Sequence, residues 1–98
     1  MNTGVDTKKR YLMIFEGRVH GVGFRAFVQR LALQYNCTGT VRNMANGMVE
    51  MQIQGEENQI RIILSKIKEG NRFIRVDDIH KKEIALQPDE KRFEVRYF

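Results

Sequence analysis

The sequence has 98 residues, of which 42% are apolar, and it carries 17 Lys and Arg against 12 Asp and Glu. This length suits one domain with a modest core and leaves no room for a second. The sequence contains no run of about 18 apolar residues, the length that could span a bilayer. We therefore expect a cytoplasmic protein with no membrane partner. The net charge of +5 favours anionic partners without choosing between a small phosphate compound and nucleic acid.

The chain contains one cysteine, Cys37, so the sequence allows no internal disulfide and no cysteine metal cluster. A single thiol is consistent with a reducing compartment such as the cytoplasm. We interpret Cys37 as a small buried apolar residue rather than a nucleophile.

Residues 1–8 show no apolar periodicity, and we expect a disordered leader there, followed by one domain over residues 9–98. Tyr11–Glu16 is a short apolar run rich in strand-forming residues. A helical stripe follows, with members 3, 4, 7, 8 and 11 positions after the first. Its members are Phe24, Phe27, Val28, Leu31, Ala32 and Tyr35. We expect Asn36 to end this helix.

Thr38–Asn43 predicts a second strand, and Asn46-Gly47 predicts a tight hairpin turn because both residues tolerate positive φ. Residues 48–54 alternate apolar and polar side chains, which is typical of a half-buried strand. A second helix is indicated next: Glu56 and Glu57 suit its positively polarised start, and Gly70 marks its end. The apolar stripe of this helix consists of Ile60, Ile63, Leu64 and Ile67.

Residues 74–84 predict a further strand with one break in register, which we interpret as a β-bulge. The segment from Phe93 through Val95 to Tyr97 alternates and predicts a last short strand. The order is therefore β-α-β-β-α-β plus a terminal strand. It predicts an α+β fold, a ferredoxin-like βαββαβ sandwich in which an antiparallel sheet carries two helices on one face.

The segment from Gly17 to Arg25, GRVHGVGFR, has the composition of an anion-binding loop. Its three glycines allow tight turns and positive φ, so successive backbone N–H groups can point to one position. The start of the following helix adds free N–H groups and the positive end of the helix dipole, and Arg25 adds a planar guanidinium. A phosphate group fits this combination. A plain strand-to-helix connection with an exposed arginine is the alternative interpretation.

The expected topology also places a carboxamide near this loop. If the connection from the first strand to the second is right-handed and parallel, both strands end at the same edge of the sheet. The loop leaves the first strand there, and Asn43 closes the second. The topology thus predicts that Arg25 and Asn43, 18 positions apart, meet at one edge.

The loop resembles the first signature of the acylphosphatase family, G-x-V-x-G-V-x-F-R, and a second signature, G-[aromatic]-V-x-N-x3-G-x-V-x5-G, is similar to GTVRNMANGMVEMQIQG. Thr40 departs from the second signature, because the family usually has an aromatic residue there. The matching residues are Gly17, Val19, Gly21, Val22, Phe24 and Arg25 in the first signature and Gly39, Val41, Asn43, Gly47, Val49 and Gly55 in the second. The resemblance extends from about Tyr11 to Tyr97.

This resemblance implies hydrolysis of the carboxyl-phosphate bond of acyl phosphates to a carboxylate and inorganic phosphate, by attack of water and without a metal or other cofactor. It implies that Arg25 holds the phosphoryl oxygens and that Asn43 orients the attacking water. The backbone that would bind the phosphate belongs to His20, Gly21, Val22, Gly23 and Phe24. The expected partners are a small acyl phosphate and, as site ligands, inorganic phosphate or sulfate; we expect a monomer.

Two other functions remain open from the sequence. One is a non-catalytic phosphate- or nucleic-acid-binding module of ferredoxin-like fold. Nucleic acid is disfavoured because residues 48–55 offer Met, Glu and Gln where an RNA-recognition sheet needs aromatic rings. The other is a carbamoyl-phosphate-handling domain like the acylphosphatase-like part of hydrogenase maturation proteins, which are far longer and carry cysteine clusters.

The remaining ionisable residues give no further site. His20 lies inside the loop, and we expect it to have a supporting role at most. His80 lies on a charged predicted strand, and we expect it to have no function. Asp77 and Asp78 are adjacent and should point to opposite faces of that strand, so we expect no metal site.

Overall fold

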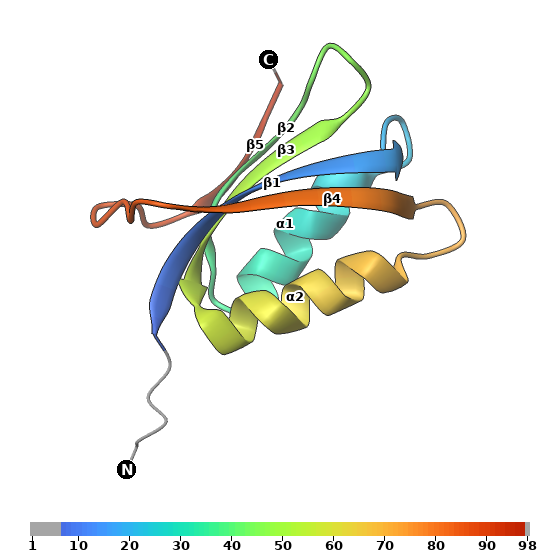
Figure 1. Cartoon of the computed structure of the whole chain (residues 1–98). Helices are drawn as coiled ribbons and strands as arrows, with labels where there is room; N and C mark the ends of the chain where they lie inside the picture. The colour runs from blue at the N-terminus through green and yellow to red at the C-terminus, as the bar shows by residue number, and fades with distance from the viewer. Residues whose placement is uncertain (1–6, 98) are drawn as a thin grey trace.

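In the computed structural model, which describes residues 7–97, five strands form one sheet and two helices pack on the same face of it (Figure 1). The strands are β1 (Lys8–Arg18), β2 (Thr38–Asn43), β3 (Val49–Glu56), β4 (Arg75–Ile84) and β5 (Phe93–Arg96), and the helices are α1 (Phe24–Gln34) and α2 (Glu57–Glu69). The strand order is β4-β1-β3-β2-β5. The predicted α+β, ferredoxin-like fold is confirmed.

Two features of the sheet differ from the expectation. β1 is longer than the predicted Tyr11–Glu16, because the charged residues at both of its ends also pair with neighbouring strands. Lys8, the last residue of the predicted leader, pairs with Glu56, whereas residues 1–6 lie outside the described part of the chain. β5 pairs with β2 in parallel, so the sheet is mixed rather than wholly antiparallel.

The core lies between the sheet and the helices, and alternate residues of the strands build it. Met13 and Phe15 of β1 and Met51 and Ile53 of β3 are at most 1% exposed. The helices contribute Phe24, Val28, Leu31 and Ala32 from α1 and Ile60, Ile63 and Ile67 from α2. Burying one side chain of this size stabilises the fold by about 1.5–3 kcal/mol. The core therefore fixes the strand register on which the position of the site depends.

The hairpin between β2 and β3 is confirmed, but its turn is longer than two residues. Met44 N–H donates to the carbonyl of Met48 at 2.8 Å and closes the turn. Gly47 takes a positive φ of 89°, whereas Asn46 does not. The side-chain oxygen of Asn46 accepts a hydrogen bond from Met48 N–H at 3.0 Å and so stabilises the turn. This turn follows directly after Asn43, the last residue of β2.

β4 contains the predicted bulge. The register between β1 and β4 shifts between Glu16 and Gly17, and Asp77 is left without a partner on β1. Because of this extra residue, Val76 and Ile79 both pack against the core although they are three positions apart. The bulge thus explains the break in the apolar pattern of this strand.

The outer face of the sheet carries a polar network around a buried arginine. Arg10 is 3% exposed and donates to the two carboxylate oxygens of Glu90 at 2.7 and 3.2 Å and to Gln52 at 2.9 Å. Gln87 N–H donates to the side chain of Gln54 at 2.7 Å. These contacts hold the segment between β4 and β5 on the outer face, and so they fix the point from which β5 starts.

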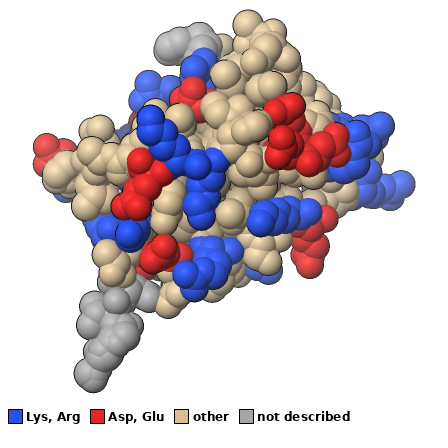
Figure 2. All heavy atoms as spheres, viewed as in Figure 1, with Lys and Arg blue, Asp and Glu red and all other residues tan. Residues whose placement is uncertain are grey.

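Lys and Arg side chains are interspersed with Asp and Glu on the face drawn in Figure 2. This distribution is typical of a solvated surface rather than of a single-sign patch. Of the helices within residues 7–97, none combines the length and the apolar character that crossing a membrane requires.

Candidate active site at the carboxyl ends of β1 and β2

Buried side chains fix both ends of the loop between β1 and α1. Val19 is 2% exposed and Phe24 is 1% exposed, and the ring of Phe24 meets that of Phe15 edge-on with centroids 5.3 Å apart. Between these anchors, Gly21 and Gly23 have φ values of 68° and 76°, and a Cβ on either would meet no atom within 4 Å. The backbone is therefore held in shape while its glycines stay open to solvent.

The N–H groups of this loop are available to an anion. Within residues 7–97, no other residue accepts a hydrogen bond from the backbone N–H groups of residues 20–24. The start of α1 has no side-chain cap and no acidic residue in its first turn, whereas α2 begins with Glu57. The positive end of the α1 dipole is thus not neutralised by the protein, and an anion is favoured there.

Arg25 lies in the first turn of α1, and the last strand holds its guanidinium. One of its terminal nitrogens, Nη1, donates to the carbonyl of Arg96 at 2.9 Å, and the guanidinium carbon lies 4.6 Å from the centre of the Tyr97 ring. Arg25 also lines an open groove of about 870 Å³ between α1 and β5. The groove can accommodate a small molecule beside the guanidinium.

Asn43 ends β2 at the same edge of the sheet, as the topology predicts. Val49 of β3 pairs with Asn43 on one side and with Phe15 on the other. Because neighbouring strands are about 4.8 Å apart, Asn43 and Phe15 are separated by about 10 Å. Phe15 lies four residues before Val19, the first residue after β1. The register therefore places Asn43 and the loop at the same edge of the sheet.

The side-chain oxygen of Asn43 has an unusual environment. Its Oδ1 atom is shielded from solvent and has no hydrogen-bond partner within residues 7–97. Buried polar atoms are almost always hydrogen-bonded, so an exception needs an explanation. This unpaired acceptor marks Asn43 as a candidate functional residue.

His20 is exposed and contacts the hairpin between β2 and β3. Its Nε2 lies 3.1 Å from the carbonyl oxygen of Met48. A carbonyl can only accept, so Nε2 carries the proton and donates. This contact joins the loop to the hairpin that follows Asn43, which is a structural role.

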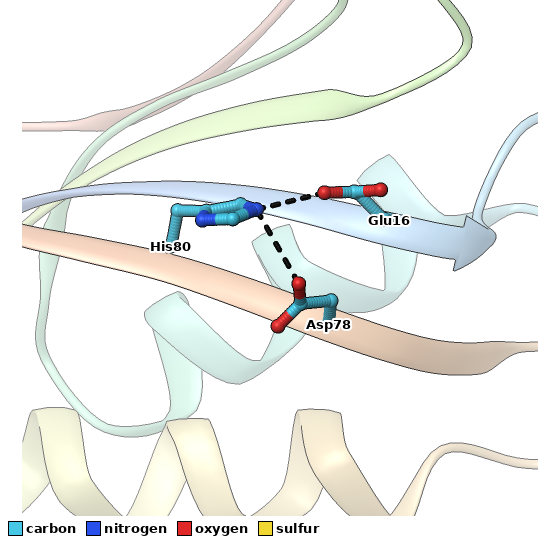
Figure 3. A group of neighbouring side chains, drawn as sticks. All are labelled: Glu16, Asp78 and His80. Carbon is cyan, nitrogen blue, oxygen red and sulfur yellow. Dashed lines mark hydrogen bonds and ion pairs between the residues drawn. The ribbon is translucent and has the colours of Figure 1, made fainter.

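A group of three ionisable side chains at the start of the loop was missed by sequence reasoning (Figure 3). Nε2 of His80 donates to Glu16 at 2.7 Å and lies 3.5 Å from a carboxylate oxygen of Asp78. The hydrogen bond to Glu16, together with the nearby charge of Asp78, raises the pKa of His80. The group depends on the register between β1 and β4, which the sequence pattern does not reveal.

Cys37 behaves as the sequence predicts. The residue is buried, and its burial raises the pKa of the thiol to about 11. The thiol is therefore protonated at neutral pH, and it packs as a small apolar group rather than acting as a nucleophile.

Comparisons with known proteins agree with this architecture. The acylphosphatase family model matches residues 11–95. An acylphosphatase of Clostridium acetobutylicum is 46% identical over 89 residues, which cover 91% of this chain and 98% of that protein. The crystal structure of acylphosphatase from Bacillus subtilis superimposes with a TM-score of 0.85 and 36% identity, over 93% of this chain and 100% of that chain.

A longer protein shares the same fold. Full-length HypF, in its phosphate- and nucleotide-bound form, matches with a TM-score of 0.81 and 28% identity, but this chain covers only 12% of it. The similarity to the acylphosphatases, by contrast, extends over nearly their whole length. Fold and geometry define a small α+β protein in which a glycine-rich loop leads into an uncapped helix at one edge of the sheet. The chain belongs to the acylphosphatase family.

Proposed function

We propose that the loop from Gly17 to Arg25 binds the phosphoryl group of an acyl phosphate and that Asn43 orients the water molecule that attacks it. The activity itself follows from the family: the protein is an acylphosphatase, an enzyme that hydrolyses acyl phosphates. The residue assignments are supported by three features of one edge of the sheet: free N–H groups in the loop, a guanidinium held by Arg96, and the unpartnered oxygen of Asn43.

Arg25 and the loop backbone stabilise charge. In a loose phosphoryl transfer the protein chiefly positions the reactants and stabilises negative charge on the three equatorial oxygens. The N–H groups of residues 20–24 and the remaining donors of the Arg25 guanidinium suit these oxygens. Because Arg96 and Tyr97 hold the guanidinium in advance, little reorganisation is needed when the substrate binds.

Asn43 acts by hydrogen bonding rather than as a base. Its Oδ1 accepts a hydrogen bond from the water and thereby directs an oxygen lone pair toward phosphorus. An amide takes no proton at neutral pH, so a phosphoryl oxygen is the eventual proton acceptor. The leaving carboxylate needs neither an acid nor a metal, since its conjugate acid titrates near about 4.

The contact between Arg25 and Tyr97 predicts a modest kinetic effect. Tyr97→Leu removes the aromatic ring beneath the guanidinium, a contact that stabilises by about 0.5–1 kcal/mol at an exposed site. We expect kcat/KM for benzoyl phosphate to fall by about two- to fivefold. Phe73→Leu is the matched control, because Arg72 lies over that ring at 5.2 Å on another part of the surface. An equal loss in both variants would contradict a role of Tyr97 in positioning Arg25.

Inorganic phosphate is expected to bind the loop and raise the melting temperature. Binding to the folded state alone stabilises it by RT ln(1 + [L]/Kd), which is about 1.4 kcal/mol at ten times Kd. For a domain of this size that corresponds to several degrees. Chloride at matched ionic strength controls for screening, and Arg25→Ala tests the site. If chloride raised the melting temperature as much as phosphate does, or if phosphate raised that of Arg25→Ala as much as that of the parent, the loop would only connect β1 to α1.

The binding-module alternative finds less support in the outer face of the sheet. RNA-recognition sheets of this fold stack bases on aromatic rings of their open face. Within the described chain, the outward positions of the two central strands carry no aromatic ring. These positions are Arg10, Leu12, Ile14 and Glu16 on β1 and Glu50, Gln52 and Gln54 on β3. The absence of nucleic acid, the monomeric state and the cytoplasmic location stay predictions.

A further inference from the structure

Glu16, Asp78 and His80 lie together on the outer face of the sheet, between β1 and the edge strand β4 (Figure 3). Glu16 pairs directly with Asp78 in the antiparallel register. His80 follows Asp78 by two positions on the same strand, and side chains two positions apart share a face. Two carboxylates opposite each other on neighbouring strands repel, so this arrangement favours a cation between them.

The protein itself supplies little positive charge to these carboxylates. Among the ion pairs of residues 7–97, Glu16 and Asp78 have His80 as their partner and neither meets a Lys or Arg. One oxygen of Asp78 accepts a hydrogen bond from the N–H of Ile79 at 2.9 Å, which leaves the other oxygen directed at His80. All three side chains are at least 37% exposed, so an ion from solvent can reach them.

We propose that Glu16, Asp78 and His80 bind a divalent transition-metal ion, and that Zn²⁺ fits them best. The three ligand atoms lie within 4.8 Å of one another. Tetrahedral Zn²⁺ with bonds of about 2.0–2.2 Å places two ligand atoms about 3.3 Å apart. The 3.5 Å between His80 and Asp78 is already close to this spacing. The 2.7 Å between His80 and Glu16 has to widen, which exposed side chains permit.

The donor set selects the kind of ion. One imidazole nitrogen with two carboxylate oxygens suits Zn²⁺ and related transition metals, whereas Mg²⁺ and Ca²⁺ prefer oxygen ligands alone. The ion takes the lone pair of Nε2: the imidazolium form of His80 releases its Nε2 proton to solvent, whereas the neutral form shifts that proton to Nδ1, and water completes the coordination. Bound in this way, the metal ties the edge strand β4 to the end of β1, one residue before the loop that starts at Gly17.

The test uses the intact protein in phosphate-free buffer. The chain has two histidines, so its NMR spectrum contains two sets of imidazole signals, and His20→Ala assigns them. We expect one equivalent of Zn²⁺ to shift the His80 signals and leave those of His20 in place. In calorimetry, His80→Ala, Glu16→Gln and Asp78→Asn should each weaken Zn²⁺ binding by about tenfold or more, since even ligand-supporting residues have effects of this size. His20→Ala is the matched control and should bind Zn²⁺ as the parent does.

Three results would overturn the proposal. One is that the His80 signals of the parent do not respond to Zn²⁺, a readout that needs no folded variant at this position. Another is that His80→Ala binds Zn²⁺ as tightly as His20→Ala does, which would place the metal elsewhere. The third is that Mg²⁺ shifts the His80 signals as strongly as Zn²⁺, because the group would then be an ion-pair cluster without a metal preference.

Discussion

Arg25→Lys is expected to lower kcat/KM for benzoyl phosphate by about 10² to 10³ while the protein stays folded. A lysine ammonium is a point charge and cannot reproduce the planar two-point contact of a guanidinium with phosphoryl oxygens. Arg25 uses Nη1 to donate to the Arg96 carbonyl, and its other guanidinium nitrogens remain for the phosphoryl group. Steady-state kinetics, with the melting temperature as a check on folding, measure this effect.

Arg30→Lys is the matched control for that variant. Arg30 is exposed on the same helix, five positions after Arg25 and outside the first turn. We expect its kinetics to equal those of the parent. Near-normal turnover of Arg25→Lys would contradict the proposal that Arg25 binds the phosphoryl oxygens.

Asn43→Ala is expected to lower kcat by about 10², because misplacing one reactant in the active site has an effect of this order. Inhibition by inorganic phosphate should change little, since the substitution removes the orientation of water and leaves the anion-binding loop intact. The comparison of kcat with the phosphate inhibition constant separates the two roles. Asn58→Ala on α2 serves as a control for the loss of a carboxamide elsewhere.

A parallel loss of phosphate inhibition and kcat in Asn43→Ala would contradict this division of roles. Asn43 would then be a ligand of the anion, and its Oδ1 would not be reserved for water. An unchanged kcat would remove Asn43 from the mechanism altogether.

Much of the fold was predictable because its signals are local. The apolar stripes of both helices have the period of an α-helix, and Asn36, with φ of 59°, ends the first helical segment as predicted. The break in pattern between Val76 and Ile79 indicated the bulge in β4. The parallel pairing of β5 with β2 was not predictable, because the alternation of side chains along a strand is the same whether the strand runs parallel or antiparallel to its neighbour. Only the packed core decides between these two directions.

The position of the candidate site residues in the fold was predictable in part. The glycines, Arg25 and Asn43 carry signals in their own segments, and the crossover topology places them at one edge. The contact of Arg25 with Tyr97 joins residues from opposite ends of the chain, and no local pattern predicts it. The group formed by Glu16 and His80 was also hidden, because it depends on which residues of β1 and β4 face each other.

The fate of an oxygen label tests most directly whether the loop presents phosphorus to a water molecule. Benzoyl phosphate is hydrolysed by the protein in water enriched in ¹⁸O, and the products are analysed by mass spectrometry. Attack on phosphorus breaks the bond between phosphorus and the bridging oxygen, so we expect the label in inorganic phosphate. Label in benzoate would mean that water attacks the carbonyl carbon, and it would contradict the roles of both Arg25 and Asn43.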